Sequence, residues 1–163
     1  MKKIGVLILV VLMLMCGCTA KGNFEGVSDV LGQQEPAVPR QIRLRLPQEA
    51  AAQVIAGDAG TLYLCDGYEV AVQTLPGGDL QHTLRELTGY DKDRLTLLET
   101  PQQIGTRYDF VWTAAGEAGD IVARASVLDD GSFHYCLTAT ASADVSGALT
   151  DSWQAIFASY GLS

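Results

Sequence analysis

Outside the N-terminal region, the residues best suited to chemistry are two histidines and two cysteines. They are His82, His134, Cys65 and Cys136. Metal sites built from such residues usually show close spacings such as C-x-x-C or H-x-x-x-H, and neither spacing occurs among them. The sequence therefore predicts no metal site and no bound cofactor.

His134 and Cys136 come closest to a pair of base and nucleophile. Side chains two residues apart in a strand share a face at about 7 Å, which is too far for a direct hydrogen bond. The sequence also contains no Walker loop, no G-x-S-x-G and no G-x-G-x-x-G motif. We therefore expect no catalytic residue. The alternative is a small envelope hydrolase or thiol enzyme that uses His134 and Cys136.

The first eighteen residues have the order of an export signal. Two lysines precede an apolar run of 12 residues, from 4 to 15, and the small-residue stretch that contains Cys16 and Cys18 follows. A helix of that length covers about 18 Å, against about 30 Å of hydrocarbon in a bilayer, so it is too short for a permanent span. The pattern is typical of a signal peptide that is removed after export.

The stretch Met15-Cys16-Gly17-Cys18 resembles the lipobox of bacterial lipoproteins. In that group a small residue precedes a cysteine that receives a diacylglyceryl group and becomes the first residue of the mature chain. Gly17 precedes Cys18, whereas bulky Met15 precedes Cys16, so Cys18 is the expected site of lipid attachment. The resemblance implies a protein held by fatty acyl chains such as palmitate at the extracytoplasmic face of the bacterial cell membrane.

Composition and broken periodicity divide the chain into three parts. We expect a signal peptide at 1–17, a lipidated N-terminus with a flexible linker at 18–40, and a single globular domain at 41–163. The chain has 11 Lys and Arg against 19 Asp and Glu, and removal of the signal's two lysines would leave a net charge of −10. This acidic balance argues against a nucleic-acid partner and against electrostatic adhesion of the domain to anionic lipids.

Periodicity predicts the elements of the domain. Strands are expected at 41–46, 61–65, 68–75, 94–99, 106–113, 121–128 and 133–139. Helices are expected at 48–56 and 145–160, and between the N-cap Asp79 and the C-terminal Gly89. The final helix has an apolar stripe that should cover the sheet.

Apolar pairing predicts the register of the first hairpin. A two-residue Asp66-Gly67 loop is a strong hairpin signal, and pairing outward from it places Cys65 opposite Tyr68. The same register places Tyr63 opposite Val70 on a face that belongs in the core.

Two registers are open for the strands that flank Gly131. A loop of three residues, with Gly131 left-handed, pairs Val127 with Phe133 and is favoured over a loop of two residues, because it keeps the apolar residues on one face. It places His134 and Cys136 near Ser126 and Arg124, on the face opposite Cys65. Opposite faces disfavour a disulfide between Cys65 and Cys136, although the pairing stays open.

The last strand and helix resemble the C-terminal end of the Mog1/PsbP/DcrB-like domains. The resemblance rests on the strand at 133–138, a polar turn and a helix with Trp153, Ile156, Phe157, Ser159 and Tyr160; the early strand that ends in Pro47 also fits. It implies an α+β fold with an antiparallel sheet of about six to seven strands and two to three packed helices. Another small α+β sandwich, cystatin-like or NTF2-like, is the alternative fold.

In that group the fold more often serves interaction or assembly than catalysis. We therefore expect a cell-envelope lipoprotein that acts as a non-catalytic binding or assembly module. Its expected partners are the membrane, reached through the lipid on Cys18, and an envelope protein.

Overall fold

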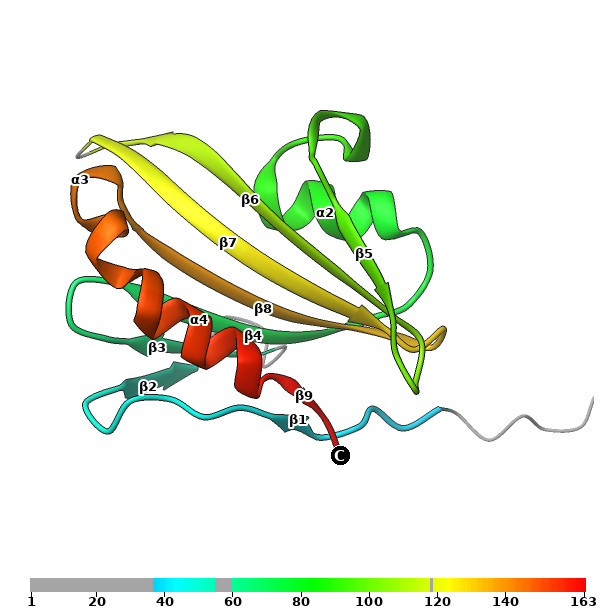
Figure 1. Ribbon diagram of the computed structural model, residues 1–163. Helices are drawn as coiled ribbons and strands as arrows, with labels where there is room; N and C mark the ends of the chain where they lie inside the picture. Colours follow the sequence, from blue (N-terminus) through cyan, green and yellow to red (C-terminus); the bar gives the residue numbers. More distant parts are fainter. Residues whose placement is uncertain (1–36, 55–59, 118) are drawn as a thin grey trace, which may run out of the picture. The chain divides into compact units, whose positions relative to one another are not determined.

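A computed structural model describes residues 37–54, 60–117 and 119–163 of the chain (Figure 1). The expected signal peptide, Cys18 and most of the expected linker lie outside the described residues. The described part from residue 37 onward forms one compact unit.

Within these residues, seven strands form one antiparallel sheet. They are β2 (Ala51–Val54), β3 (Gly60–Leu64), β4 (Glu69–Pro76), β5 (Leu98–Pro101), β6 (Thr106–Gly116), β7 (Gly119–Asp129) and β8 (Phe133–Ser142). The order across the sheet is β2-β3-β4-β8-β7-β6-β5, so the four strands β5 to β8 form a meander and the β3–β4 hairpin extends it. A separate short pair joins β1 (Ile42–Arg43) to β9 (Gly161–Leu162).

Helices lie on both faces of the sheet (Figure 1). They are α2 (Leu80–Thr88), α3 (Ala143–Ser146) and α4 (Thr150–Ser159), with 3-10 turns at η1 (Lys92–Arg94) and η2 (Gly147–Leu149). This arrangement confirms the predicted α+β fold.

The α4 face of the sheet holds the larger of two apolar clusters. Trp153, Ile156 and Phe157 of α4 pack on alternate residues of β4 and β8, which include Val70 and Leu137. The spacing of the α4 residues matches the stripe that the sequence predicts. Burial of such side chains, at about 25 cal/mol per Å² of apolar area, makes this face the main source of stability.

The α2 face holds a second, smaller cluster. Leu84 of α2 is fully buried against Phe110, Val127 and Cys136. The helix begins and ends as predicted: Asp79 caps it by accepting a hydrogen bond from the Gln81 N–H at 3.0 Å, and Gly89 ends it in the left-handed conformation, at φ 76°. Each face of the sheet therefore carries an apolar cluster under a helix.

The register of the first hairpin is confirmed. Tyr63 pairs with Val70, and the Cys65 N–H donates to the Tyr68 carbonyl at 2.9 Å. The favoured register of the later hairpin is wrong, because Val127 pairs with Cys136 rather than with Phe133. Apolar pattern could not decide it, since the residues on either face of β7 and β8 are buried.

Side-chain hydrogen bonds to the backbone support a longer turn between β7 and β8. The carboxylate of Asp130 accepts hydrogen bonds from the N–H groups of Ser132 and Phe133 at 2.9 and 2.8 Å. Gly131 is left-handed as expected, at φ 88°. The loop is therefore built by carboxylates as well as by glycine.

Four element predictions are corrected. The expected helix at 48–56 is wrong where the structure describes it, because Ala51–Val54 pairs with β3 as an edge strand and this pairing overrides the helix propensity. The helix at 145–160 is broken, with η2 between α3 and α4. The strands expected at 41–46 and 94–99 are shorter or shifted, to β1 and β5, although Leu44 and Leu46 still pack on the core.

Candidate functional site

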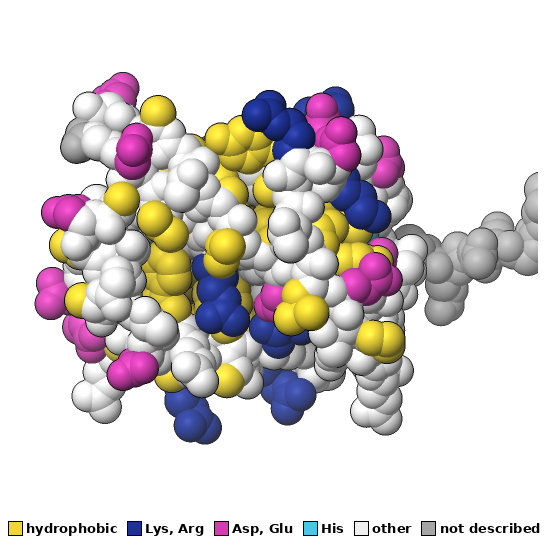
Figure 2. All heavy atoms as spheres, turned by 45° about the horizontal axis from the view of Figure 1, so that its top comes forward, with side chains coloured by type: hydrophobic (Ala, Val, Ile, Leu, Met, Phe, Trp, Pro, Cys, Tyr) yellow, Lys and Arg dark blue, Asp and Glu magenta, His cyan; other side chains and the backbone are white. Residues whose placement is uncertain are grey.

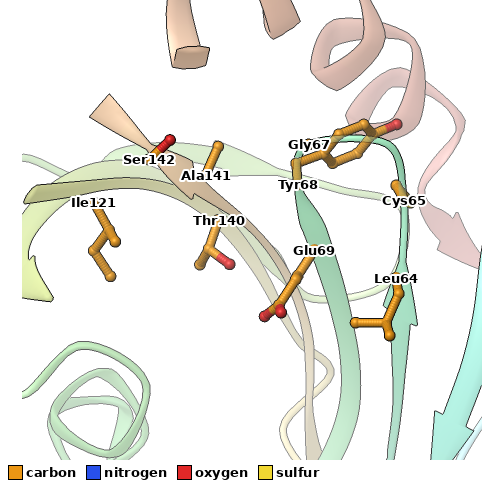
Figure 3. Close-up of a pocket in the computed structure, with 9 residues that line it drawn as sticks. All are labelled: Leu64, Cys65, Gly67, Tyr68, Glu69, Ile121, Thr140, Ala141 and Ser142. Atoms are coloured by element: carbon orange, nitrogen blue, oxygen red, sulfur yellow. The ribbon is translucent and has the colours of Figure 1, made fainter. Parts of the chain in front are cut away.

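A hollow of about 510 Å³ lies beside the turn that joins β3 to β4 (Figure 3). Four segments form it: the end of β3, the following turn with the start of β4, the start of β7 and the end of β8. Its lining residues are Leu64, Cys65, Gly67, Tyr68, Glu69, Ile121, Thr140, Ala141 and Ser142. Because these residues are far apart in sequence, only the sheet order brings them together.

The hollow opens on the part of the α2 face that α2 leaves uncovered. In Figure 3 the side chains of Leu64, Glu69 and Thr140 extend to one side of the sheet, and Ala141 extends to the other. Glu69 and Thr140 are directly paired across β4 and β8. The strand alternation that buries Val70 under α4 therefore turns these side chains into the hollow.

The lining combines apolar, hydroxyl and acidic groups. Leu64 and Ile121 are half-buried, and Thr140 and Ser142 add hydroxyls. Glu69 is exposed, and no ion pair joins its carboxylate to a cation among the described residues. Such a surface suits a ligand with an aliphatic part and a positive charge.

Tyr68 separates this hollow from a second one of about 460 Å³. The second hollow lies between α4 and the segment from Arg45 to Glu49. Burial, followed by the nearby Cys65 and Glu49, raises the pKa of Tyr68 to about 12. The phenol therefore stays neutral near pH 7 and can serve in hydrogen bonding but not as a base.

His134 lies in a sealed polar cluster between α2 and the sheet. Its Nδ1 is 2.7 Å from the hydroxyl oxygen of Thr83, and its Nε2 is 3.6 Å from a carboxylate oxygen of Asp129. The His134 side chain is fully buried, and Thr83 is only 3% exposed. Because no substrate could reach His134 or Thr83 without a movement of α2, their contact serves to fix the helix to the sheet.

Cys136 is likewise sealed and poorly suited to catalysis. It is 1% exposed, and burial, with a smaller contribution from Glu86, raises its pKa to about 12. The thiolate that a thiol enzyme needs is therefore scarce at neutral pH. The expected neighbours of His134 and Cys136 are also wrong, because Ser126 and Arg124 lie on the α4 face of β7 while Cys136 packs beside Val127.

Cys65 and Cys136 lie on opposite faces of the sheet, as the sequence predicts. Cys65 packs on the α4-face cluster, and Cys136 belongs to the α2-face cluster. Both are free thiols. Burial is also the main cause that raises the pKa of Cys65.

No group of three or more His, Cys, Asp or Glu side chains in the described part of the chain could hold a metal ion. Among the same residues, no helix has the length and apolarity needed to span a bilayer.

The sequence does not predict the hollow, because the residues that line it carry no motif. Leu64, Glu69 and Thr140 belong to common types and to three different strands. The hairpin register around Asp66-Gly67 predicts that Leu64 and Glu69 share the face opposite Val70, so half of the wall could have been found. The other half needs the β4–β8 pairing, which local pattern does not predict.

The sequence matches no protein-family model and no curated protein. Its fold is similar to solved structures. PsbP of the cyanobacterium Synechocystis aligns with a TM-score of 0.53 and 9% identity, over 82% of this chain and 99% of that one. The Ran-binding protein Mog1p of Saccharomyces cerevisiae aligns with a TM-score of 0.48 and 13% identity, over 74% and 89% of the two chains.

A protein of Bacteroides thetaiotaomicron aligns with a TM-score of 0.49 and 11% identity, over 75% of this chain. That alignment covers only 45% of the Bacteroides chain. At such identities the likeness concerns the fold alone, and the alignment with PsbP carries it. The chain therefore has the Mog1/PsbP-like α+β fold that its last strand and helix predict.

Proposed function

We propose that this protein is a cell-envelope lipoprotein, tethered through Cys18, whose folded part is a non-catalytic binding module. The binding site in this proposal is the hollow beside the β3–β4 turn. One observation carries it: the open hollow has apolar and hydroxyl walls with a carboxylate at Glu69, while His134 and Cys136 are sealed elsewhere. The groups that line the hollow can bind, and the pair that a thiol enzyme would use, His134 and Cys136, is not accessible.

The chemistry of the lining indicates the partner. Leu64 and Ile121 would contact an aliphatic side chain, and Glu69 would pair with a positive charge. A lysine or arginine side chain combines both features, since its stem is aliphatic and its head is cationic. The proposed partner is therefore an envelope protein that inserts a basic side chain into the hollow.

The tether is tested by substitution of the two N-terminal cysteines. Cys18→Ala should abolish labelling with radioactive palmitate and release the protein from the membrane fraction. Cys16→Ala is the matched control and should retain both the palmitate label and the association with the membrane fraction. Retention of label in Cys18→Ala, or its loss only in Cys16→Ala, would refute attachment at Cys18.

The binding site is tested by photo-crosslinking in cells. A photo-reactive amino acid at Ser142, on the rim of the hollow, should give a defined adduct with one envelope protein. Glu69→Lys should reduce this adduct about tenfold, because a reversed charge repels the basic side chain. Glu99→Lys makes the same change in net charge on β5 and should leave the adduct unchanged, so equal loss in both variants would refute the site.

A further inference from the structure

The segment that opens the described part of the chain is basic, although the protein is acidic. Residues 37–46 (AVPRQIRLRL) hold Arg40, Arg43 and Arg45 and no Asp or Glu, whereas the whole chain has 19 acidic residues against 11 Lys and Arg. This segment contains β1, and the Ser163 N–H donates to the Gln41 carbonyl at 3.0 Å. Figure 2 shows Lys and Arg side chains at the lower border of one face, where few Asp and Glu side chains lie.

Two of these arginines keep their charge available. Arg43 and Arg45 are exposed, and no carboxylate among the described residues, Ser163 included, forms an ion pair with either. Arg43 Nε donates to the Leu162 carbonyl at 3.1 Å, which holds the side chain along β9 without neutralising it. Arg40 differs, because its Nε lies 3.7 Å from the carboxylate of Asp130.

Two hollows flank Arg43, and neither is lined by an acidic side chain. One, of about 410 Å³, is shared by Arg43 and Arg45. The other, of about 250 Å³, is shared by Arg43 and Arg107, whose own charge is balanced by Asp109 at 2.8 Å. Open space beside unpaired guanidinium groups suits a phosphate, which arginine can bind through two parallel hydrogen bonds.

The position of this edge in the chain indicates where the phosphate comes from. Cys18 and the arginines are separated by about 20 residues, and the flexible linker that the sequence predicts there would have a root-mean-square span of about 25 Å. The arginines thus lie near the start of the described residues, close in sequence to the proposed lipid anchor. Within such a distance, the membrane surface supplies phosphate at high effective concentration.

We propose that Arg43 and Arg45, named here the basic edge, bind the phosphates of anionic lipids in the membrane that holds the anchor. The proposal rests on the proposed tether at Cys18. The lipid on Cys18 provides attachment, and the basic edge orients the domain, since the acidic remainder of the surface is repelled by the same lipids. Each arginine near such a surface strengthens the contact roughly fivefold.

Hydrogen exchange on the lipidated full-length protein in vesicles tests the orientation. Vesicles that contain about 30% phosphatidylglycerol should slow amide exchange of residues 41–46 several-fold relative to pure phosphatidylcholine, and about 0.5 M NaCl should remove the difference. Arg43→Gln with Arg45→Gln should abolish the protection. The control variant, Lys92→Gln with Arg94→Gln, removes the same charge from η1 and should keep the protection of residues 41–46.

Each outcome decides the proposal. Equal exchange on both vesicle types, or equal loss in the two double variants, would overturn it. Protection by about 10 mM inorganic phosphate on neutral vesicles would show a free-phosphate site instead of a membrane contact. Thermal unfolding of the double variants checks that both fold, and co-sedimentation with the vesicles reports separately on the anchor, so failure of the tether and failure of the basic edge are distinguishable.

Discussion

The two faces of the seven-stranded sheet are built for different tasks. On the α4 face, arginines from the sheet hold the helix: Arg124 stacks on the Phe157 ring at 4.3 Å, and Arg107 donates to the Phe157 carbonyl at 3.2 Å. The hydroxyl of Tyr160, directly after α4, also fastens the helix to the sheet, because it donates to the Tyr135 carbonyl at 2.7 Å. Together with the larger apolar cluster, these contacts cover this face for stability.

The α2 face is only partly covered. The short helix α2 closes over Phe110 and Cys136 and is tied down by the Thr83–His134 contact. Beyond the helix the sheet stays open at Glu69 and Thr140. One sheet therefore combines a covered face that fixes the fold with a second face that is partly open to solvent.

The largest expected effect on stability concerns the α4 face of the sheet. Phe157→Ala removes a ring that is 1% exposed and should lower the free energy of unfolding by about 3–5 kcal/mol. Val111→Ala, at a residue that is 65% exposed, is the control and should change it by less than about 0.5 kcal/mol. Urea unfolding measures both, and similar values would contradict the assignment of stability to the α4 contacts.

A smaller effect is expected where α2 meets the sheet. Thr83→Val keeps the shape of the side chain but leaves Nδ1 of His134 buried without its hydroxyl partner, so the free energy of unfolding should fall by about 1–3 kcal/mol. Thr113→Val, at an exposed position of β6, should cost less than about 0.5 kcal/mol. If Thr83→Val also proves neutral, then the polar cluster does not fix the helix.

The hydrogen bonds and the ion pair of Asp130 predict how acid affects the stability of the domain. Burial alone would raise the pKa of Asp130, but hydrogen bonds from the Phe133 and Ser132 N–H groups, the Tyr135 hydroxyl and the charge of Arg40 lower it below the ordinary value of 3.8. A folded pKa below the unfolded one adds stability that is complete above about pH 4 and is lost as the pH falls through the folded pKa. Asp130→Asn should remove this part of the acid sensitivity in unfolding experiments between about pH 2 and 7, and unchanged pH dependence would contradict the role of Asp130.

Much of the scaffold is predictable because local signals agree with the final contacts. Asp66-Gly67 predicts the β3–β4 hairpin, and Asp79 and Gly89 predict the bounds of α2. Where two answers satisfy the same pattern, the prediction fails. Both faces of β7 and β8 are largely buried, so the register between Val127 and Cys136 follows from the loop and from sheet packing rather than from alternation.

The candidate site is less predictable than the scaffold. Its wall depends on the pairing of Glu69 with Thr140, which are far apart in sequence and are joined only by the order of strands in the sheet. The basic edge and Arg40 are visible in the sequence as three arginines within six residues, but the absence of acidic side chains from the hollows that flank Arg43 needs the structure. The reason is physical in both cases: function here depends on what surrounds a side chain, and local sequence does not determine those surroundings.

The most direct test asks whether the open hollow binds a partner without contributing to stability. It uses the variants with the smallest expected change in the free energy of unfolding. Thr140→Trp fills the hollow on the open face, and Thr100→Trp adds the same side chain on β5 as a control. In one set of samples, urea unfolding and the crosslink from Ser142 are measured together. We predict that both variants keep the free energy of unfolding within about 0.5 kcal/mol of the parent, and that only Thr140→Trp loses the crosslinked adduct. An adduct that survives in Thr140→Trp, or that is lost equally in Thr100→Trp, would contradict the account.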